Sequence, residues 1–174
     1  DSKATPKPNA GLAMKYHMRR HDKEIKDAVL LRKILSETKF VTIAMAKDNH
    51  PYLVSMNHGY DSERNCIYFH CANEGKKLDF MKANSEVWGQ ALVDFGYDAK
   101  KCKQSYATVM FRGKVSFIED VEQKRKAFLI MNDQLKSPYK RLERILKTNL
   151  SNTVVGRIDI DFMSGKKSKE VTIE

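Results

Sequence analysis

Apolar and polar positions alternate with two different periods along the chain, and the changes of period predict its helices and strands. Apolar residues at three-and-four spacing predict helices over residues 22–36, 73–84, 119–135 and 139–147, the first with Asp22 as its N-cap. Alternating or compact apolar runs predict strands over residues 40–46, 52–60, 66–71, 86–95, 106–118, 153–162 and 169–173. No regular strand–helix–strand repeat is visible. The pattern therefore predicts a mainly β fold with peripheral α-helices, in which six or seven mostly antiparallel strands form a barrel and three or four helices pack outside it.

Turn signals between these runs predict how the strands connect. Lys47–His50 separates two strands as a hairpin turn, and the polar segment Asp61–Asn65 separates the next two, so the second to fourth strands should form a meander. Gly96–Gln104 is predicted to be a lysine-containing loop. Gly113 marks a bulge within a long strand, and Gly165 sets a turn over Met163–Lys167.

Length and composition favour one domain. A chain of 174 residues, 41% of them apolar, can bury one core but not comfortably two, so residues 18–174 are expected to form a single domain. Residues 1–17, which include Pro6 and Pro8, are expected to be a flexible leader and do not have the order of a secretory signal. No run approaches the about 18 apolar residues of a membrane span, so no membrane partner is expected.

Cysteine usage and charge restrict the function less strongly. Cys66, Cys71 and Cys102 form no CxxC pair, which argues against a disulfide framework or a zinc site and favours a reducing, cytoplasmic location with no bound metal. The net charge of +10 is spread over several short basic groups. It is compatible with a phosphorylated ligand or an acidic partner, and a nucleic-acid-binding barrel stays open as a minor alternative although no nucleic acid is expected.

The most informative block is residues 67–79, in which a strand leads through a glycine turn into a helix that begins with two lysines. Free backbone N–H groups and the positive end of the helix dipole favour an anion at such a place. Lys76 or Lys77 adds a full positive charge, and His70 can donate a further hydrogen bond. The alternative is an ordinary strand-to-helix connection with two solvated lysines and a packed histidine.

This block resembles a signature of the pyridoxamine 5'-phosphate oxidase-like FMN-binding split barrels, in their nitroimidazole-resistance branch. The matching positions are Tyr68, Phe69, His70, Ala72, Gly75, Lys77, Leu78 and Asp79. Further similar segments follow the family order: Met18–Arg20, Pro51–Met56 (with Ser55 where relatives have proline), Thr108–Gly113 and Ser164–Lys166. The resemblance implies a split β-barrel that binds FMN at the interface of a homodimer, with residues drawn from both chains.

By this resemblance, two groups of residues would hold the cofactor. The isoalloxazine and ribityl portions would be lined by Val54, Ser55, Met56 and Asn57. The phosphate end would be approached by His70, Lys76, Lys77 and Thr108. For Met56 and Thr108 simple packing in the sheet is an equally good explanation. His58 is expected to be a packing histidine rather than a catalyst.

The resemblance implies an FMN-dependent oxidoreductase that takes hydride from a reduced nicotinamide and reduces a small acceptor such as a nitroaromatic (nitroimidazole) compound. The cofactor would carry out the redox chemistry, and the protein would supply position and polarity. By the same resemblance, His70 would be the catalytic residue, in a polar role near the acceptor. The main alternative is a non-catalytic flavin or haem carrier.

Overall fold

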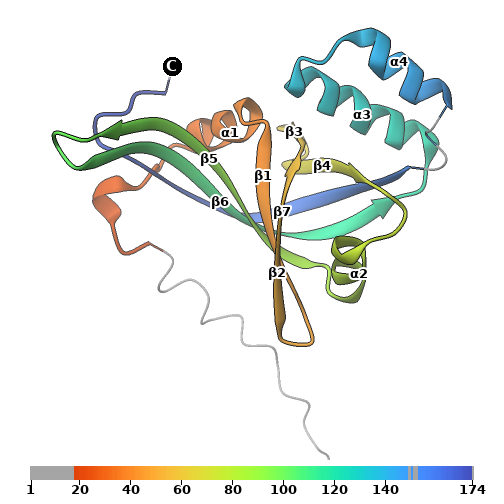
Figure 1. Cartoon of the computed structure of the whole chain (residues 1–174), viewed down its shortest axis with the longest axis horizontal. Coiled ribbons are helices and arrows are strands. Elements are labelled where there is room, and N and C mark those ends of the chain that lie inside the picture. Colours follow the sequence, from red (N-terminus) through yellow and green to blue (C-terminus); the bar gives the residue numbers. More distant parts are fainter. Residues whose placement is uncertain (1–17, 149, 151–152, 174) are drawn as a thin grey trace, which may run out of the picture.

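The computed structural model describes residues 18–148, 150 and 153–173 and shows one seven-stranded antiparallel sheet with helices around it (Figure 1). The strands are β1 Phe40–Lys47, β2 His50–Asn57, β3 Gly59–Asp61, β4 Cys66–Cys71, β5 Glu86–Asp98, β6 Lys103–Ile118 and β7 Val154–Lys167. The helices are a short 3-10 turn η1 His21–Lys23, then α1 Ala28–Glu37, α2 Lys76–Ala83, α3 Val121–Leu135 and α4 Tyr139–Thr148. The predicted mainly β split barrel is confirmed. The predicted leader over residues 1–17 lies outside the described residues.

The sheet has two edge strands that are consecutive in the chain. Its order is β2-β1-β5-β6-β7-β4-β3, and only His58 separates β2 from β3. The hairpin of β1 and β2 is confirmed, with Asp48 and Asn49 in its turn at positive φ. The pairing predicted across the turn Asp61–Asn65 is confirmed, since β3 pairs with β4, but the predicted meander does not continue, because β4 pairs next with β7 and not with β5. The alternating polarity of residues 52–60 predicted one continuous strand, whereas the structure has a break at His58.

Two buried clusters lie on opposite sides of the barrel wall. The larger fills the barrel with residues of β1, β4, β5 and β6, and α1 and α2 contribute Leu35 and Leu78 to it. The smaller lies under α3 and α4 and includes Phe128 and Leu142. Cys66 belongs to the smaller cluster, whereas Cys71, five residues further along β4, belongs to the larger. These two cysteines therefore face opposite sides of β4, as an odd separation of five residues in a strand requires.

The first helix begins later than predicted. Its N-cap is Asp27, whose carboxylate accepts a hydrogen bond from the backbone N–H of Val29 at 2.8 Å. Asp22, the predicted N-cap, instead pairs with the guanidinium of Arg20 at 2.7 Å. Glu24, between the two acids, forms a β-bridge with Lys166. The chain thus runs along β7 before it turns into α1.

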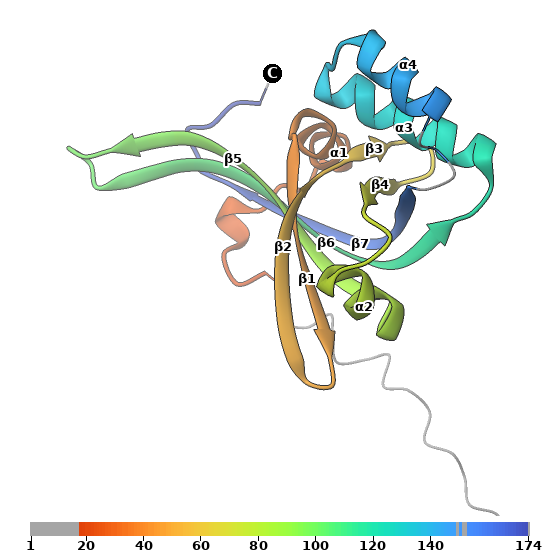
Figure 2. The same ribbon diagram turned by 45° about the vertical axis from the view of Figure 1, so that its right-hand side comes forward.

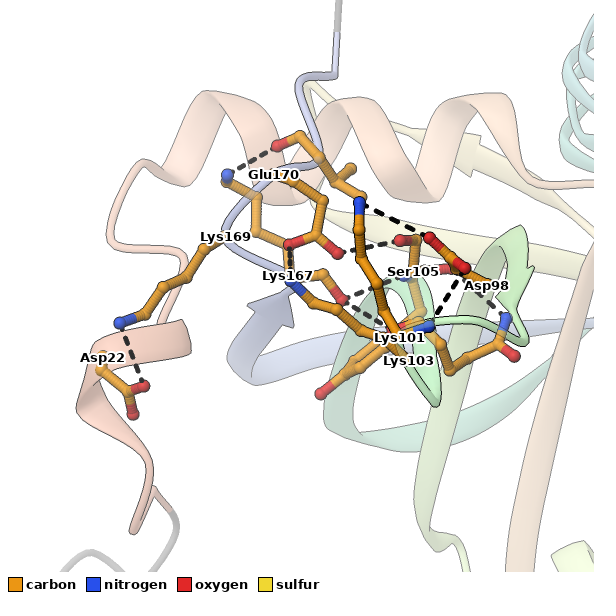
Figure 3. Close-up of polar contacts among 12 residues, drawn as sticks. Asp22, Asp98, Lys101, Lys103, Ser105, Lys167, Lys169 and Glu170 are labelled. Carbon is orange, nitrogen blue, oxygen red and sulfur yellow. Dashed lines mark hydrogen bonds and ion pairs between the residues drawn. The ribbon is translucent and has the colours of Figure 1, made fainter.

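The predicted loop over Gly96–Gln104 is mostly a continuation of β5 and β6, which project from the barrel as a two-stranded arm (Figures 1 and 2). Polar contacts fasten the following C-terminal segment to the arm (Figure 3). The carboxylate of Glu170 accepts hydrogen bonds from Lys103 at 2.7 Å and Ser105 at 2.8 Å. These contacts lower the pKa of Glu170 to about 2.

The predicted turn over Met163–Lys167 is wrong, because β7 continues without interruption to Lys167. Gly165 allows close packing here: a Cβ at this position would lie 2.3 Å from a methyl carbon of Leu31 and 3.1 Å from the carbonyl oxygen of Thr108. The predicted last strand over residues 169–173 is also absent. The predicted irregularity at Gly113 is confirmed, since the register of β6 and β7 shifts between Arg112 and Gly113.

Candidate functional site

The outer face of β2, β1, β5 and β6 carries a polar row within an apolar surface. The hydroxyl of Ser55 is 2.9 Å from the hydroxyl of Thr42, and Thr42 lies opposite Gln90 in the next strand. The amide of Gln90 donates to the hydroxyl of Thr108 at 3.1 Å. Exposed apolar side chains of these strands surround the row: Phe40, Leu53, Trp88, Leu92 and Met110. A sheet surface of this composition suits a planar ring with polar edges.

The four predicted β2 residues divide between the two faces of the sheet. Val54 packs against the barrel core and Met56 is buried in it, so only their backbones are accessible to a ligand on the outer face. Ser55 and Asn57 are exposed, and the side-chain amide of Asn57 donates to the carbonyl of Lys39 at 3.0 Å. For Met56 the packing explanation therefore accounts for the side chain.

The start of α2 has the features expected of an anion site. Gly75, at φ +133, is the N-cap, and its carbonyl accepts hydrogen bonds from the N–H groups of Leu78 and Asp79. The earlier N–H groups of a helix have no intrahelical partner. Lys77 is half-buried at this end, and its charge acts on Cys71, where it opposes the rise in thiol pKa that burial causes.

Lys76 is held differently from Lys77. Its ammonium nitrogen lies 4.6 Å from the ring centroid of Tyr52 and 5.6 Å from that of Phe80. Cation–π contacts of this length stabilise the Lys76 side chain in an orientation toward Tyr52 and Phe80. Lys77 is therefore the better placed of the two for a phosphate.

His70 lies beside a pocket between the sheet and the α3–α4 hairpin. Its imidazole centroid is 5.4 Å from the ring centroid of Phe128 on α3. The pocket has a volume of about 340 Å³ and is lined by Asn57, His70, Phe128, Met131, Asn132, Leu135, Ser137, Leu142 and Ile145. It joins two of the predicted site residues, Asn57 and His70, which are on different strands.

Thr108 is not brought together with His70, Lys76 and Lys77 in one chain. It lies on β6 opposite Leu92 and Lys166, on the arm side of the barrel, whereas α2 packs against β1 and β2. Its hydroxyl donates to the carbonyl of Ala91 at 2.9 Å. Thr108 is therefore part of the outer-face row in its own chain.

His58 is fully buried and part of a hydrogen-bond network rather than of the outer face. Both amide hydrogens of Gln134 are used by the carbonyls of Leu35 and Thr38, at 2.9 and 2.6 Å. The Nε2 of His58 donates to Leu35 at 3.0 Å, and its Nδ1 has no hydrogen-bond partner among the described residues. Burial lowers the pKa of His58. Its predicted role in packing is consistent with this environment.

Thr42 and Gln90 are site residues that sequence reasoning missed. Thr42 lies within a run that reads as continuously apolar, and Gln90 lies in a strand whose most conspicuous residue is Trp88. The alternation of buried and exposed positions along a strand could have predicted that both side chains face outward, because Thr42 and Gln90 occupy outward positions of β1 and β5. Among the described residues, no group of acidic, cysteine and histidine side chains could hold a metal ion. Nor does any helix in the described part of the chain have the length and apolarity to span a membrane.

A seven-stranded antiparallel barrel, a polar row on its outer face and two lysines at the start of α2 thus make up the fold and the candidate site. The family model for pyridoxamine 5'-phosphate oxidase matches residues 28–167. The chain belongs to this family, and the resemblance seen in the sequence is confirmed.

Solved structures share this fold. A candidate 5-nitroimidazole antibiotic resistance protein from Bacteroides thetaiotaomicron is 25% identical with a TM-score of 0.67, the match covering 82% of this chain and 85% of that one. An FAD-binding protein from Mesorhizobium loti is 23% identical with a TM-score of 0.61, covering 82% and 96%. An FAD and haem binding protein from Mycobacterium smegmatis is 17% identical with a TM-score of 0.70, covering 87% and 76%. No curated protein is significantly similar in sequence.

Proposed function

We propose that the protein is an FMN-dependent oxidoreductase that reduces small acceptors, such as nitroaromatic compounds, with electrons from a reduced nicotinamide. The observation that carries the proposal is the outer-face row of Ser55, Thr42, Gln90 and Thr108 within an exposed apolar surface, in a chain of this family. For a nitro compound the balanced reaction is NAD(P)H + H⁺ + ArNO₂ → NAD(P)⁺ + ArNO + H₂O. Bound flavin would supply the two-electron redox chemistry.

The residues fit FMN in two respects, and two further residues fit an acceptor. The apolar surface with its hydroxyl and amide row suits the isoalloxazine ring, whose edge has both donors and acceptors. The N–H groups that follow Gly75, together with Lys77, suit the phosphate. His70 and Asn57 lie where the pocket meets the sheet, and they would orient an acceptor by hydrogen bonds.

The proposal includes a homodimer, because the outer face is too apolar to stay in water. Phe40, Leu53 and Leu92 are each more than half exposed on it. Packing two copies face to face would bury these side chains and exclude water from the ring. Thr108, which is remote from His70 in one chain, would then lie at this interface with the rest of the outer-face row. A cytoplasmic location is also part of the proposal and agrees with Cys66, Cys71 and Cys102 being free thiols.

The cofactor is tested by the absorption spectrum of the purified protein and by titration with FMN. We expect oxidised-flavin bands and rapid anaerobic bleaching by NADPH or NADH. Lys77→Ala should weaken FMN binding about tenfold or more, since it removes a charge-assisted hydrogen bond. Lys82→Ala, in the last turn of the same helix, is the matched control and should bind FMN normally.

Three results would contradict the proposal. Absence of FMN binding would remove the cofactor assignment. Equal FMN affinity in the Lys77 and Lys82 variants would remove the phosphate assignment. Bound flavin that no reduced nicotinamide bleaches would favour the carrier over the enzyme.

The dimer is tested by sedimentation. Leu92→Glu, on the outer face, should give monomers that have lost FMN. Val29→Glu, on α1 and also well exposed, should stay dimeric. A wild-type monomer in solution would refute this part of the proposal.

A further inference from the structure

The α3–α4 hairpin carries a disproportionate share of the positive charge of the chain. Residues 121–148 contain eight lysines and arginines against three acids, a net charge of +5 within a total of +10. α4 packs on α3 and lies at the edge of the molecule (Figures 1 and 2). Half of the net charge is therefore concentrated in one short hairpin.

On α4 the cations form a stripe that faces solvent. Lys140, Arg144 and Lys147 are exposed and are spaced four and three residues apart, which places them on one face of the helix. At the rise of an α-helix this basic stripe is about 10 Å long. The opposite face of α4 packs inward, since Leu142 is buried and Leu146 is half-buried.

Much of the charge of the hairpin is not used within the chain. On the projecting arm Lys103 pairs with Glu170 at 2.7 Å and so holds the C-terminal segment (Figure 3). By contrast, Lys140 and Lys136, which lies in the turn before α4, are both exposed, and neither has an ion-pair partner among the described residues. Their charges are available to a partner.

Three anionic partners could be attracted here, and the surroundings favour a protein. A helix that binds a membrane surface inserts its apolar face, but Leu142 on that face of α4 is buried in the protein. A nucleic acid presents closely spaced phosphates, and Glu143, which flanks the stripe and pairs with Lys147 at 2.6 Å, would repel them. Tyr139, 65% exposed beside Lys140, is of a residue type that is enriched in protein interfaces.

We propose that the basic stripe is the docking site for an acidic peptide segment of a partner protein. Its carboxylates would pair with Lys140, Arg144 and Lys147, and Tyr139 would supply an aromatic contact. The inner face of α4 lines the pocket beside His70, so the bound segment would lie on the outer side of that pocket wall. The inference goes beyond the proposed oxidoreductase function and does not depend on it.

Fluorescence anisotropy tests the site with a short labelled peptide of alternating aspartate and glutamate. The FMN-supplemented full chain should bind this peptide at low salt, and added NaCl should weaken the binding. Lys140→Glu combined with Arg144→Glu should weaken it at least about tenfold, because two attractions become repulsions. The matched control is Lys100→Glu combined with Lys101→Glu, which makes the same change of net charge at the exposed tip of the arm and should weaken binding less than about threefold.

A second pair of substitutions protects the test against loss of structure. Lys136→Glu combined with Lys140→Glu changes only one residue within α4 and should also weaken peptide binding at least about tenfold. Circular dichroism confirms that each variant is folded. Flavin content and bleaching by NADPH, measured on the same samples, should not change, so a failure of the oxidoreductase proposal is seen separately.

Three results would overturn the inference. The first is a wild-type chain that does not bind the peptide at low salt. The second is an equal loss of binding in the arm and hairpin variants, which would mean that only the total charge matters. The third is tighter binding of a DNA duplex, a single-stranded RNA or phosphatidylserine vesicles than of the peptide at the same salt, abolished by the hairpin substitutions, which would assign the stripe to another class of partner.

Discussion

Replacement of Gln134 by methionine should destabilise the protein strongly although Gln134 is outside the candidate site. Gln134, near the end of α3, joins three elements through hydrogen bonds to backbone groups. Its Oε1 accepts from the N–H of Tyr60 in β3 at 2.7 Å, and its Nε2 donates to Leu35 and Thr38 at the end of α1. Methionine has a similar length and helix propensity, so the change removes mainly these bonds.

The expected magnitude follows from the groups left behind. The carbonyl of Leu35 keeps the hydrogen bond from His58, but the N–H of Tyr60 and the carbonyl of Thr38 each lose the Gln134 bond in a largely buried region. Each buried group without a partner costs about 1–3 kcal/mol, so the free energy of unfolding should fall by about 3 kcal/mol. With a denaturant slope of about 2 kcal/mol/M, the urea midpoint should fall by about 1.5 M.

Urea denaturation followed by circular dichroism measures this change. The control is Gln123→Met, because Gln123 is exposed near the start of the same helix and only its backbone N–H serves the N-cap Asp120. Gln123→Met should change the free energy of unfolding by less than about 0.5 kcal/mol. A loss below about 1 kcal/mol for Gln134→Met would show that water or rearranged side chains replace the bonds, and would refute the reasoning.

Three further predictions concern pH and packing. Burial lowers the pKa of His58 below its usual value of 6.5, so below pH 6.5 the unfolded state binds a proton more readily than the folded state does. The contribution of His58 to the free energy of unfolding should therefore be complete above pH 6.5 and should fall as the pH decreases below it. A calorimetric pH series without this fall would contradict the burial argument. The carboxyl of Glu170 should titrate near pH 2 by NMR, and in Lys103→Ala its pKa should rise toward 4.5, whereas an unchanged pKa would disprove the pairing. Gly165→Ala should destabilise the protein by about 1–3 kcal/mol in thermal unfolding, because its methyl group overlaps Leu31; wild-type stability would mean that α1 moves away freely.

Local patterns predicted most of the elements, since the apolar periods are set by the same side chains that fill the core. Ile43 and Phe111 alternate with exposed or half-buried neighbours, as their strands require, and Phe128 and Met131 mark the buried side of α3. Errors occurred where distant contacts decide the conformation. Gly165 looks like a turn residue, but it is a strand residue that Leu31 of α1 covers.

The candidate site shows the same limit. His70, Gly75 and Lys77 lie within one short segment, so their grouping could be read from the sequence. The row from Ser55 to Thr108 joins four strands, and its members Thr42 and Gln90 become neighbours only through sheet register. Register depends on the pairing of residues far apart in the chain, which one sequence does not reveal.

The single residue between β2 and β3 has a consequence for motion. Because these strands are the two edges of the sheet, the backbone of His58 is a short covalent connection between the two edges of the barrel. The network around His58 also anchors α1 and α3, so separation of the two edges would strain both helices at once. Thermal breathing should consequently concentrate in the distal half of the projecting arm, and the strand that ends at Asn57 should remain among the slowest regions to exchange its amide protons.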